Sequence, residues 1–388
     1  MIKLYPHQET GVEFLLRTPY AILADSMGLG KTIQAIELIN RDPGKTLVIC
    51  PAFLIHNWRQ EIEKFAKDPS LFTLTSYAKV KHFIGQEFDV VLSDESHYLK
   101  NPDAKRTQNF YDLVTNNKPK RLVLMSGTPV KNRVTDFWSL LYLVGATDLE
   151  YYPFCYRFAN VEKFRFGGRN ITKFTGHKNV DELKRILAPV YLRRRASEVL
   201  DLPPIIRKDI DLAPERVDNE LLQAWNEGKA FATVKKNSAK IKVKQTTAYA
   251  AELIAEGEGP LVIFSDHVEP VEDISGGLNN KGHKARLITG ATPMSERDEV
   301  VQLFQQGRLD AIVATIGALS VGVTLTAARN MIFNDLPWVP ADLLQAEKRI
   351  HRIGQNESCV IHRIFYGKVD TLIGRTLNKK LKTLIEVM

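Results

Sequence analysis

The chain has 388 residues, of which 44% are hydrophobic and 25% are charged, an ordinary globular composition. At about 150 residues per domain, this length predicts two domains. The longest apolar runs, such as Leu122–Met125, are the length of strands, which excludes a membrane-spanning helix. The 53 Lys and Arg residues outnumber the 45 Asp and Glu residues, and the resulting net charge of +8 favours a polyanionic partner.

The cysteines and the N-terminus indicate an intracellular protein. Cys50, Cys155 and Cys359 lie far apart in the sequence, which excludes a Cys-x-x-Cys metal pair and predicts reduced thiols with no disulfide. The first residues, Met1–His7, lack the basic, apolar and small-residue regions of a secretory signal. We therefore expect no membrane contact, and a cytoplasmic location in a bacterium or a virus-infected host, or a nuclear location in a eukaryote.

Two stretches of the chain alternate between expected strands and expected helices, which is typical of parallel α/β layers. The fold class is therefore α/β, with two parallel-sheet lobes in tandem. The first stretch has expected strands at 20–24, 46–50, 72–75, 90–92 and 122–125, and expected helices at 32–40, 54–66 and 105–114. The second has expected strands at 260–265, 285–289, 311–315, 331–334 and 360–365, and expected helices at 295–306, 342–352 and 370–387.

Three segments outside these elements differ in composition. Residues 133–190 are rich in aromatic side chains and contain a Gly-Gly turn at 167–168, and we interpret them as a small helical insertion. Leu202–Pro204 predicts an extended connector, because residues before proline disfavour the helical conformation. Residues 215–256 predict a Lys-rich helical insertion, whose lysines form either a solvated helix face or a surface that follows phosphates.

The strongest chemical signal is the segment 25–32, which follows an expected strand and begins an expected helix. This is the context of a phosphate-binding loop, in which glycines and a helix N-terminus present backbone N–H groups to phosphate oxygens. Lys31 is expected to reach the β- and γ-phosphates, and the Thr32 hydroxyl is expected to bind Mg²⁺. Asp25 stands where the general pattern has glycine, so a chance Gly-Leu-Gly turn is the alternative.

A second signal is the pair of adjacent carboxylates, Asp94 and Glu95, at the end of an expected apolar strand. One carboxylate can hold the Mg²⁺ shell, and the other can polarise a water for in-line attack on a γ-phosphoryl group. Ligands bind at the carboxyl ends of strands in open α/β sheets, which is where these residues lie. An acidic surface turn explains this segment alone, but it explains the pair and the upstream loop together poorly.

The third signal is in residues 345–355. Arg349 and Arg352 are three positions apart, so they share one face of the expected helix. Two guanidinium groups on one face suit a polyphosphate. Taken alone, this segment is more typical of a solvated charged helix.

In order and spacing, these three segments resemble motifs I, II and VI of superfamily 2 helicases, specifically of the Swi/Snf branch of double-stranded DNA translocases. The resemblance covers nearly the whole chain, with 126–129 similar to motif III, 192–204 to the inter-lobe signature and 317–328 to motif V. The Arg-Ile-Gly-Gln sequence at 352–355 is highly specific to this branch.

Departures from the common motifs indicate a subgroup. Ser96 in the acid box, Thr324 in motif V and the segment 334–338 are most similar to the annealing helicases, which remodel forks and rewind strands. The sequence also lacks chromodomain, bromodomain, zinc-finger and nuclease-like extensions. The resemblance therefore implies a compact bacterial or viral member.

The resemblance implies two RecA-like lobes, residues 1–200 and 205–388, with ATP and Mg²⁺ between them. Asp94 and Thr32 would hold Mg²⁺, Glu95 would activate the attacking water, and the two arginines would act as arginine fingers. The implied catalytic residues are Lys31, Asp94, Glu95, Arg349 and Arg352. The implied ATP-binding residues are Gln8, Asp25, Met27, Gly28, Leu29, Gly30, Lys31, Thr32, Gly322, Arg349 and Arg352.

The resemblance also implies double-stranded or forked DNA as the partner, bound mainly through phosphates and so with little sequence preference. The implied function is DNA-dependent ATP hydrolysis by a monomer that steps along the duplex or anneals strands. A strand-separating DNA or RNA helicase and a nucleotide-gated DNA clamp with little turnover are the alternatives. The implied DNA contacts are Trp58, Ser76, Tyr77, Lys131, Arg193, Arg194, Ser265 and Thr324.

Overall fold

The computed structural model describes residues 3–129, 133–166, 169–212, 223, 231–319 and 323–387. The predicted DNA contact Lys131 and the predicted ATP contact Gly322 lie outside these residues, as does part of the expected insertion 215–256. The chain folds as two units. Unit 1 holds the residues up to Val199 together with the C-terminal residues from Lys382, and unit 2 runs from Leu200 to Leu381.

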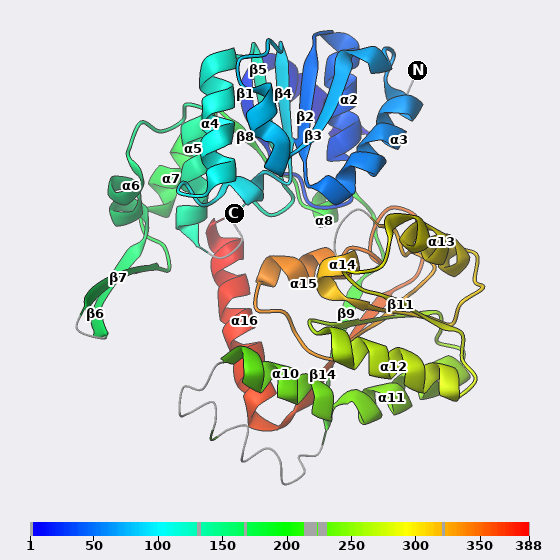
Figure 1. Cartoon of the computed structure of the whole chain (residues 1–388). Helices are drawn as coiled ribbons and strands as arrows, with labels where there is room; N and C mark the ends of the chain where they lie inside the picture. The colour runs from blue at the N-terminus through cyan, green and yellow to red at the C-terminus, as the bar shows by residue number, and fades with distance from the viewer. Residues whose placement is uncertain are drawn as a thin grey trace. The chain divides into compact units, whose positions relative to one another are not determined.

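Unit 1 is built on a six-stranded, wholly parallel sheet in the order β3-β2-β4-β5-β1-β8 (Figure 1). Central strands such as β2 are buried along their whole length, as expected for parallel strands covered by helices. The strands are Tyr20–Leu23 (β1), Thr46–Cys50 (β2), Phe72–Ser76 (β3), Val90–Asp94 (β4), Arg121–Met125 (β5) and Tyr191–Leu192 (β8).

The helices of unit 1 connect these strands and cover the sheet. Arg41 joins two of them, because its guanidinium bonds Glu9 and Glu13 of the first helix and Glu37 of its own. The α-helices are Pro6–Arg17 (α1), Lys31–Arg41 (α2), Ile55–Phe65 (α3), Lys105–Asn117 (α4), Trp138–Leu143 (α5), Tyr151–Phe158 (α6), Val180–Leu187 (α7) and Ala196–Val199 (α8). Short 3₁₀ helices are Ala52–Leu54, Pro69–Leu71, Tyr77–Phe83, Ser96–Leu99 and Val134–Phe137.

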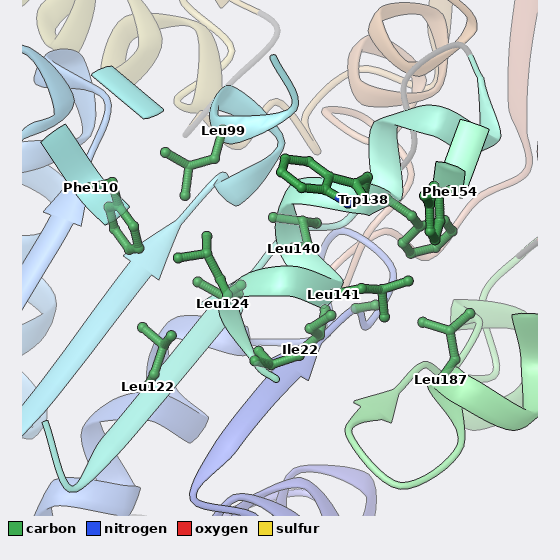
Figure 2. Close-up of a cluster of buried hydrophobic side chains, with 14 of the residues drawn as sticks. Ile22, Leu99, Phe110, Leu122, Leu124, Trp138, Leu140, Leu141, Phe154 and Leu187 are labelled. Carbon is green, nitrogen blue, oxygen red and sulfur yellow. The ribbon is translucent and has the colours of Figure 1, made fainter. Parts of the chain in front are cut away.

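The insertion after β5 belongs to the core of unit 1. Figure 2 shows Ile22 of β1 and Leu124 of β5 beside Leu140 and Leu141 of α5, and all four lie in one buried cluster. Because apolar side chains of the insertion complete this cluster, its burial ties the insertion to the sheet.

The sequence predicted a helical insertion, but the insertion is only partly helical. It contains an antiparallel hairpin of strands Asn160–Phe166 (β6) and Arg169–Thr175 (β7). The sequence did carry the signal, because two β-rich runs separated by Gly167 and Gly168 are typical of a hairpin. The aromatic composition of the surrounding residues obscured it.

Unit 2 holds a second six-stranded parallel sheet, in the order β11-β12-β10-β13-β14-β9 (Figure 1). The two predicted parallel-sheet, RecA-like lobes are thus confirmed. The strands are Ile205–Leu212 (β9), Leu261–Ser265 (β10), Ala285–Ile288 (β11), Ala311–Thr315 (β12), Asn330–Phe333 (β13) and Cys359–Tyr366 (β14). The helices are Phe231–Ile241 (α10), Val243–Ala255 (α11), Val268–Asn280 (α12), Met294–Gln305 (α13), Ile316–Leu319 (α14), Pro340–Glu347 (α15) and Gly367–Val387 (α16).

Two lysines of the Lys-rich segment have neither of the predicted roles. Lys242 is fully buried and its Nζ donates to Asp370 Oδ2 at 2.6 Å. Lys235 is 2% exposed and pairs with Asp266. Both ammonium groups are therefore internal ion-pair partners, and they are unavailable to solvent or to phosphates.

The described residues contain no helix that is long and apolar enough to cross a membrane. Cys50, Cys155 and Cys359 are all buried and free, as predicted. Within the described ranges, no group of three or more His, Cys, Asp or Glu side chains forms a candidate metal centre.

Candidate active site

The loop between β1 and α2 has the backbone conformation that its glycines predict. Gly28 and Gly30 have φ values of 84° and 76°, in the left-handed region that glycine adopts at little cost. A Cβ on Gly30 would lie 2.4 Å from Nε2 of Gln8, so a side chain there would also clash. The helix begins at Lys31, and Thr32, which is half-buried, is its second residue.

The Lys31 ammonium group lies in this loop beside the predicted acids. Its Nζ donates to the carbonyl of Asp25 at 2.8 Å and to that of Ser26 at 3.5 Å. Burial lowers the pKa of Lys31, whereas the charges of Glu95, Asp25 and Asp94 oppose that shift. The fold has therefore brought together the loop and the acid pair, which are separated by more than 60 residues in the sequence.

Asp94 ends β4, and two donors hold its carboxylate. The indole Nε1 of Trp58 donates to Oδ2 at 2.9 Å, and the backbone N–H of Glu95 donates to Oδ1 at 2.9 Å. Burial, followed by the neighbouring charge of Glu95, raises the pKa of Asp94 to about 6. Asp94 must lose its proton before it can hold a cation, so its chemistry depends on pH near neutrality.

Glu95 lies beside a chain of polar side chains that the sequence did not reveal. It has a left-handed backbone with φ of 53°, and its Oε2 lies 3.0 Å from Nδ1 of His97. The same His97 nitrogen lies 3.1 Å from Oγ of Ser126, which accepts a bond from the N–H of Thr128 at 3.2 Å. The acid pair is thus joined to the segment after β5.

The segment 126–129 also contacts the loop. A Cβ on Gly127 would lie 2.6 Å from Cγ of Met27 and 3.3 Å from Nζ of Lys31. Glycine is therefore required at this position for the loop to approach. The segment 126–129 therefore contacts both parts of the site. Gly127 lies against Met27 and Lys31 of the loop, and Ser126 lies against His97 beside the acid pair.

The loop explains why Asp25 replaces the usual glycine. Asp25 is fully buried, and its carboxylate forms an ion pair with Arg194. Its Oδ1 also accepts bonds from Nε and the backbone N–H of Arg194, at 2.9 and 3.1 Å, and its Oδ2 accepts one from Gln34. Asp25 therefore anchors the start of the loop to the segment before unit 2, and it does not itself face a phosphate.

Gln8 supports the loop from α1. Its Nε2 donates to the carbonyl of Leu29 at 3.3 Å, and its Oε1 accepts the backbone N–H of Tyr5 at 3.0 Å. His7 Nε2 lies 3.1 Å from the same Leu29 carbonyl. Gln8 thus lies against the loop, as a residue that contacts the nucleotide base must.

Removing Arg194 should destabilise unit 1. The Arg194→Ala variant leaves the Asp25 carboxylate buried without its cation, which costs about 3–5 kcal/mol in comparable buried pairs. We expect the unfolding transition of unit 1 to move to a lower urea concentration and ATP binding to weaken, as measured by urea titration and nucleotide titration. Arg329→Ala is the control, because Arg329 forms ion pairs with Glu258 and Glu357 at the surface of unit 2. Equal, small losses in both variants would contradict an anchoring role for Asp25.

Several predicted DNA contacts prove to be interior side chains. Trp58, Ser76 and Tyr77 are 2%, 6% and 4% exposed, and Ser265 is fully buried, where it donates to Asp335. Tyr77 donates to the carbonyl of Asp94 at 2.7 Å, so it supports the acid pair, as Trp58 does.

A buried side chain offers no surface to a phosphate, so the structure assigns these four residues to internal support. The guanidinium of Arg194 is likewise held by Asp25. Arg193 and Thr324 are partly exposed, and their contacts with DNA stay predictions.

In unit 2, Arg349 and Arg352 lie close together, but not because they share one face of a helix, as predicted. Helix α15 ends at Glu347, so Arg349 and Arg352 do not share a helix face. Instead, the chain turns back, and Nη1 of each arginine reaches the carbonyl of Val323, at 3.0 and 3.5 Å. The turn is closed by Gln355, whose Nε2 donates to the carbonyl of Ala328 at 2.9 Å.

The start of unit 2 is bonded to the same arginine-bearing turn. Arg207 of β9 donates to both carboxylate oxygens of Glu347, at 2.9 and 2.6 Å. His351 Nε2 lies 2.7 Å from the carbonyl of Pro203. The connector predicted at Leu202–Pro204 therefore continues into an edge strand that is tied to the arginines.

The raised pKa of Asp94 predicts a stability effect. The folded protein holds a proton on Asp94 up to pH of about 6, whereas the unfolded chain loses it near the ordinary value of 3.8. The free energy of unfolding therefore falls as the pH rises through this window, and above it the buried charge destabilises the fold. Without Mg²⁺ or nucleotide, Asp94→Asn should be more stable than the parent at pH 8 and lose this advantage near pH 4, as measured by urea unfolding. A variant less stable than the parent at pH 8 would contradict the burial argument.

A parallel α/β sheet, a glycine loop between its strand and helix, and an acid pair beside the loop lysine define a P-loop type of nucleotide-binding protein. The family model described as SNF2-related domain matches residues 7–93 and 73–255, and the Helicase conserved C-terminal domain matches residues 245–354. The chain belongs to the SNF2-related family, and the predicted Swi/Snf membership is confirmed.

Relatives of known name are similar over almost the whole chain. The DNA annealing helicase and endonuclease ZRANB3 of Bos taurus is 30% identical, over 97% of this chain and 40% of its own length. A SWI/SNF-related matrix-associated actin-dependent regulator of chromatin subfamily A-like protein 1 of Xenopus tropicalis is 28% identical, over 98% of this chain and 44% of its own. The chain thus spans less than half the length of these relatives.

Among solved structures, the chain is similar to the Sulfolobus solfataricus SWI2/SNF2 ATPase core in complex with dsDNA. The alignment covers 100% of this chain and 93% of that chain, with 22% identity and a TM-score of 0.46.

Proposed function

We propose that this chain is a DNA-dependent ATPase that uses ATP hydrolysis to move along, or to anneal, double-stranded or forked DNA. The observation that carries the proposal is the meeting of Lys31 with Asp94 and Glu95 in unit 1. In unit 2, Arg349 and Arg352 both donate to the Val323 carbonyl, which places two guanidinium groups close together, as binding of a phosphate would require. Membership of the SNF2-related family supports the same activity.

The residues of unit 1 fit ATP and Mg²⁺ by their chemistry. Mg²⁺ prefers oxygen ligands, which the Thr32 hydroxyl and the Asp94 carboxylate supply, and when bound it neutralises phosphate charge. Lys31 already donates to carbonyl oxygens at the base of the loop, so its ammonium group would exchange these for phosphate oxygens. Trp58 keeps the Asp94 carboxylate oriented throughout.

Glu95 is the proposed general base. Its carboxylate would accept a proton from the attacking water, and Nδ1 of His97 lies 3.0 Å from Oε2 of that carboxylate. In the proposal, Arg349 and Arg352 stabilise the charge that develops on the γ-phosphate. Closing and opening of the two units around each ATP would then drive stepping.

A steady-state ATPase assay with four nucleic acids tests the substrate. Single-stranded DNA, blunt duplex, forked duplex and RNA of matched length are compared, and strand annealing and triplex displacement are measured in parallel. We expect duplex or forked DNA to stimulate hydrolysis more than RNA does, and stimulation to weaken steeply with salt because phosphate contacts release counterions. Equal stimulation by RNA would overturn the DNA assignment, and DNA binding without turnover would support the clamp alternative.

We further propose that the chain works as a monomer, because one copy supplies the loop, the acids and both arginines. Light scattering coupled to size-exclusion chromatography tests this directly. A stable dimer whose kcat falls on dilution would contradict it.

A further inference from the structure

The hairpin β6–β7 projects from unit 1, and one of its ends packs against the rest of the unit (Figure 1). At that base, Phe174 is 8% exposed, and its ring lies 5.2 Å from the Tyr156 ring and 6.4 Å from the Tyr152 ring, both on α6. Val161, which pairs with Phe174, packs against the core of the unit. The hairpin is thus anchored at one end by core packing, and the remainder extends beyond it.

The projecting part is strongly basic. Between Asn160 and Thr175 the sequence has four basic residues and one acidic residue, Glu162. Lys163, Arg165 and Lys173 are exposed, and none of them forms an ion pair with another described residue. Glu162 accepts a bond from the Thr175 hydroxyl at the base, away from the tip. The free hairpin therefore offers an excess of unneutralised positive charge.

An exposed aromatic ring lies on the same hairpin as these charges. Phe164 is 45% exposed and pairs across the hairpin with Ile171. Because side chains alternate between the faces of a strand, Phe164 lies on one face and its neighbours Lys163 and Arg165 lie on the other. Almost half of the Phe164 surface is exposed to solvent, so part of its ring is available to a partner.

We propose that the β6–β7 hairpin binds unpaired nucleotides at a DNA fork. Phe164 stacks on a base, and Lys163, Arg165 and Lys173 contact phosphates. Rings combined with cations are how proteins hold single strands, because every base has a face on which a ring can stack. In an intact duplex those faces are covered by neighbouring bases, so Phe164 favours the unpaired segment. The inference rests on the proposed function, in which the substrate is duplex or forked DNA.

Three variants of the full chain separate the contributions of the ring and the charges. Phe164→Ala removes the ring, and Phe164→Tyr restores one. The double variant K163E/R165E reverses the charges. K281E/R308E is the matched control, because it changes net charge equally at exposed positions before β11 and β12, at the amino edge of the other sheet. Folding of each variant is verified by its thermal transition.

The binding of labelled forked DNA, single-stranded DNA and blunt duplex is measured by fluorescence anisotropy at one salt concentration. We expect Phe164→Ala to raise Kd for the fork and the single strand at least about fivefold, with Phe164→Tyr near the parent. K163E/R165E should raise them further, by about tenfold or more, while blunt-duplex Kd changes less than about twofold. ATPase activity without DNA should stay at the parental rate in every variant.

Three results would overturn the proposal. The first is that the hairpin variants bind forks and single strands no more weakly than the K281E/R308E control. The second is an equal loss for all three DNAs, which would make the hairpin a duplex contact. The third is unchanged DNA binding by variants that lose binding to a protein, which would make it a protein-docking surface. Failure of the parent protein to bind any DNA would instead refute the proposed function.

Discussion

Replacing Arg349 or Arg352 by Ala is expected to lower kcat by about a thousandfold or more, because arginine fingers typically contribute about 10³–10⁵. Negative charge builds on the γ-phosphate during transfer, and a guanidinium that docks only then stabilises the transition state more than bound ATP. ATP affinity should therefore change less than about tenfold. Single-turnover kinetics and a separate ATP titration measure the two quantities.

Arg349 needs one structural control, because its side chain is only 6% exposed and also bonds the Gln345 carbonyl. Thermal unfolding shows whether the variant is folded, and the half-buried Arg329→Ala provides a reference in the same unit. Lys at either position should rescue poorly, since an ammonium group lacks the planar paired donors of guanidinium. Near-parental turnover of both folded Ala variants would show that the turn after α15 is only structural.

Glu95→Gln is expected to bind ATP as tightly as the parent while losing turnover by at least about 10²–10⁴, the usual contribution of a general base. The amide has the shape of the carboxylate but cannot accept the proton of the attacking water. Glu63→Gln, at an exposed position of α3, is the matched control. Pre-steady-state hydrolysis and fluorescent-nucleotide binding give the two readouts.

Results that contradict the prediction for Glu95→Gln are also informative. Parental hydrolysis in Glu95→Gln would move the base elsewhere, and His97, 3.0 Å from the Glu95 carboxylate, would be the next candidate. Loss of ATP binding would show instead that Glu95 mainly balances the charge of Lys31, whose pKa is lowered by burial against the opposing effect of the Glu95 charge. The variant therefore distinguishes a proton acceptor from an electrostatic partner.

The sequence predicted the sheets well because parallel strands are buried on both faces and appear as short apolar runs. Elements without such runs were missed, such as the two-residue β8 and the edge strand β9, whose side chains are partly exposed. The end of α15 was placed too late, since the polar residues after Glu347 continue a helical pattern while the chain turns back on Val323.

The loop and the acid pair were also predictable, because both follow strands of one sheet. The partners of these residues were not. Asp25 bonds Arg194 across 169 positions, and Trp58 donates to Asp94 across 36 positions. No local pattern encodes such pairs. Trp58 and Arg194 were predicted to contact DNA, whereas in the structure their polar groups bond Asp94 and Asp25 inside unit 1.

The segment 194–203, which connects the two units, is held at both of its ends. Arg194 is held at the base of the phosphate loop, and Pro203 is held by His351 in the arginine-bearing turn. These two anchors are about nine residues apart, so the tether spans at most about 30 Å. A tether this short gives an effective concentration in the millimolar range. In the proposed mechanism, this tether keeps the two arginines available to the nucleotide of the same molecule, and cutting it is expected to make the reaction rate depend on protein concentration.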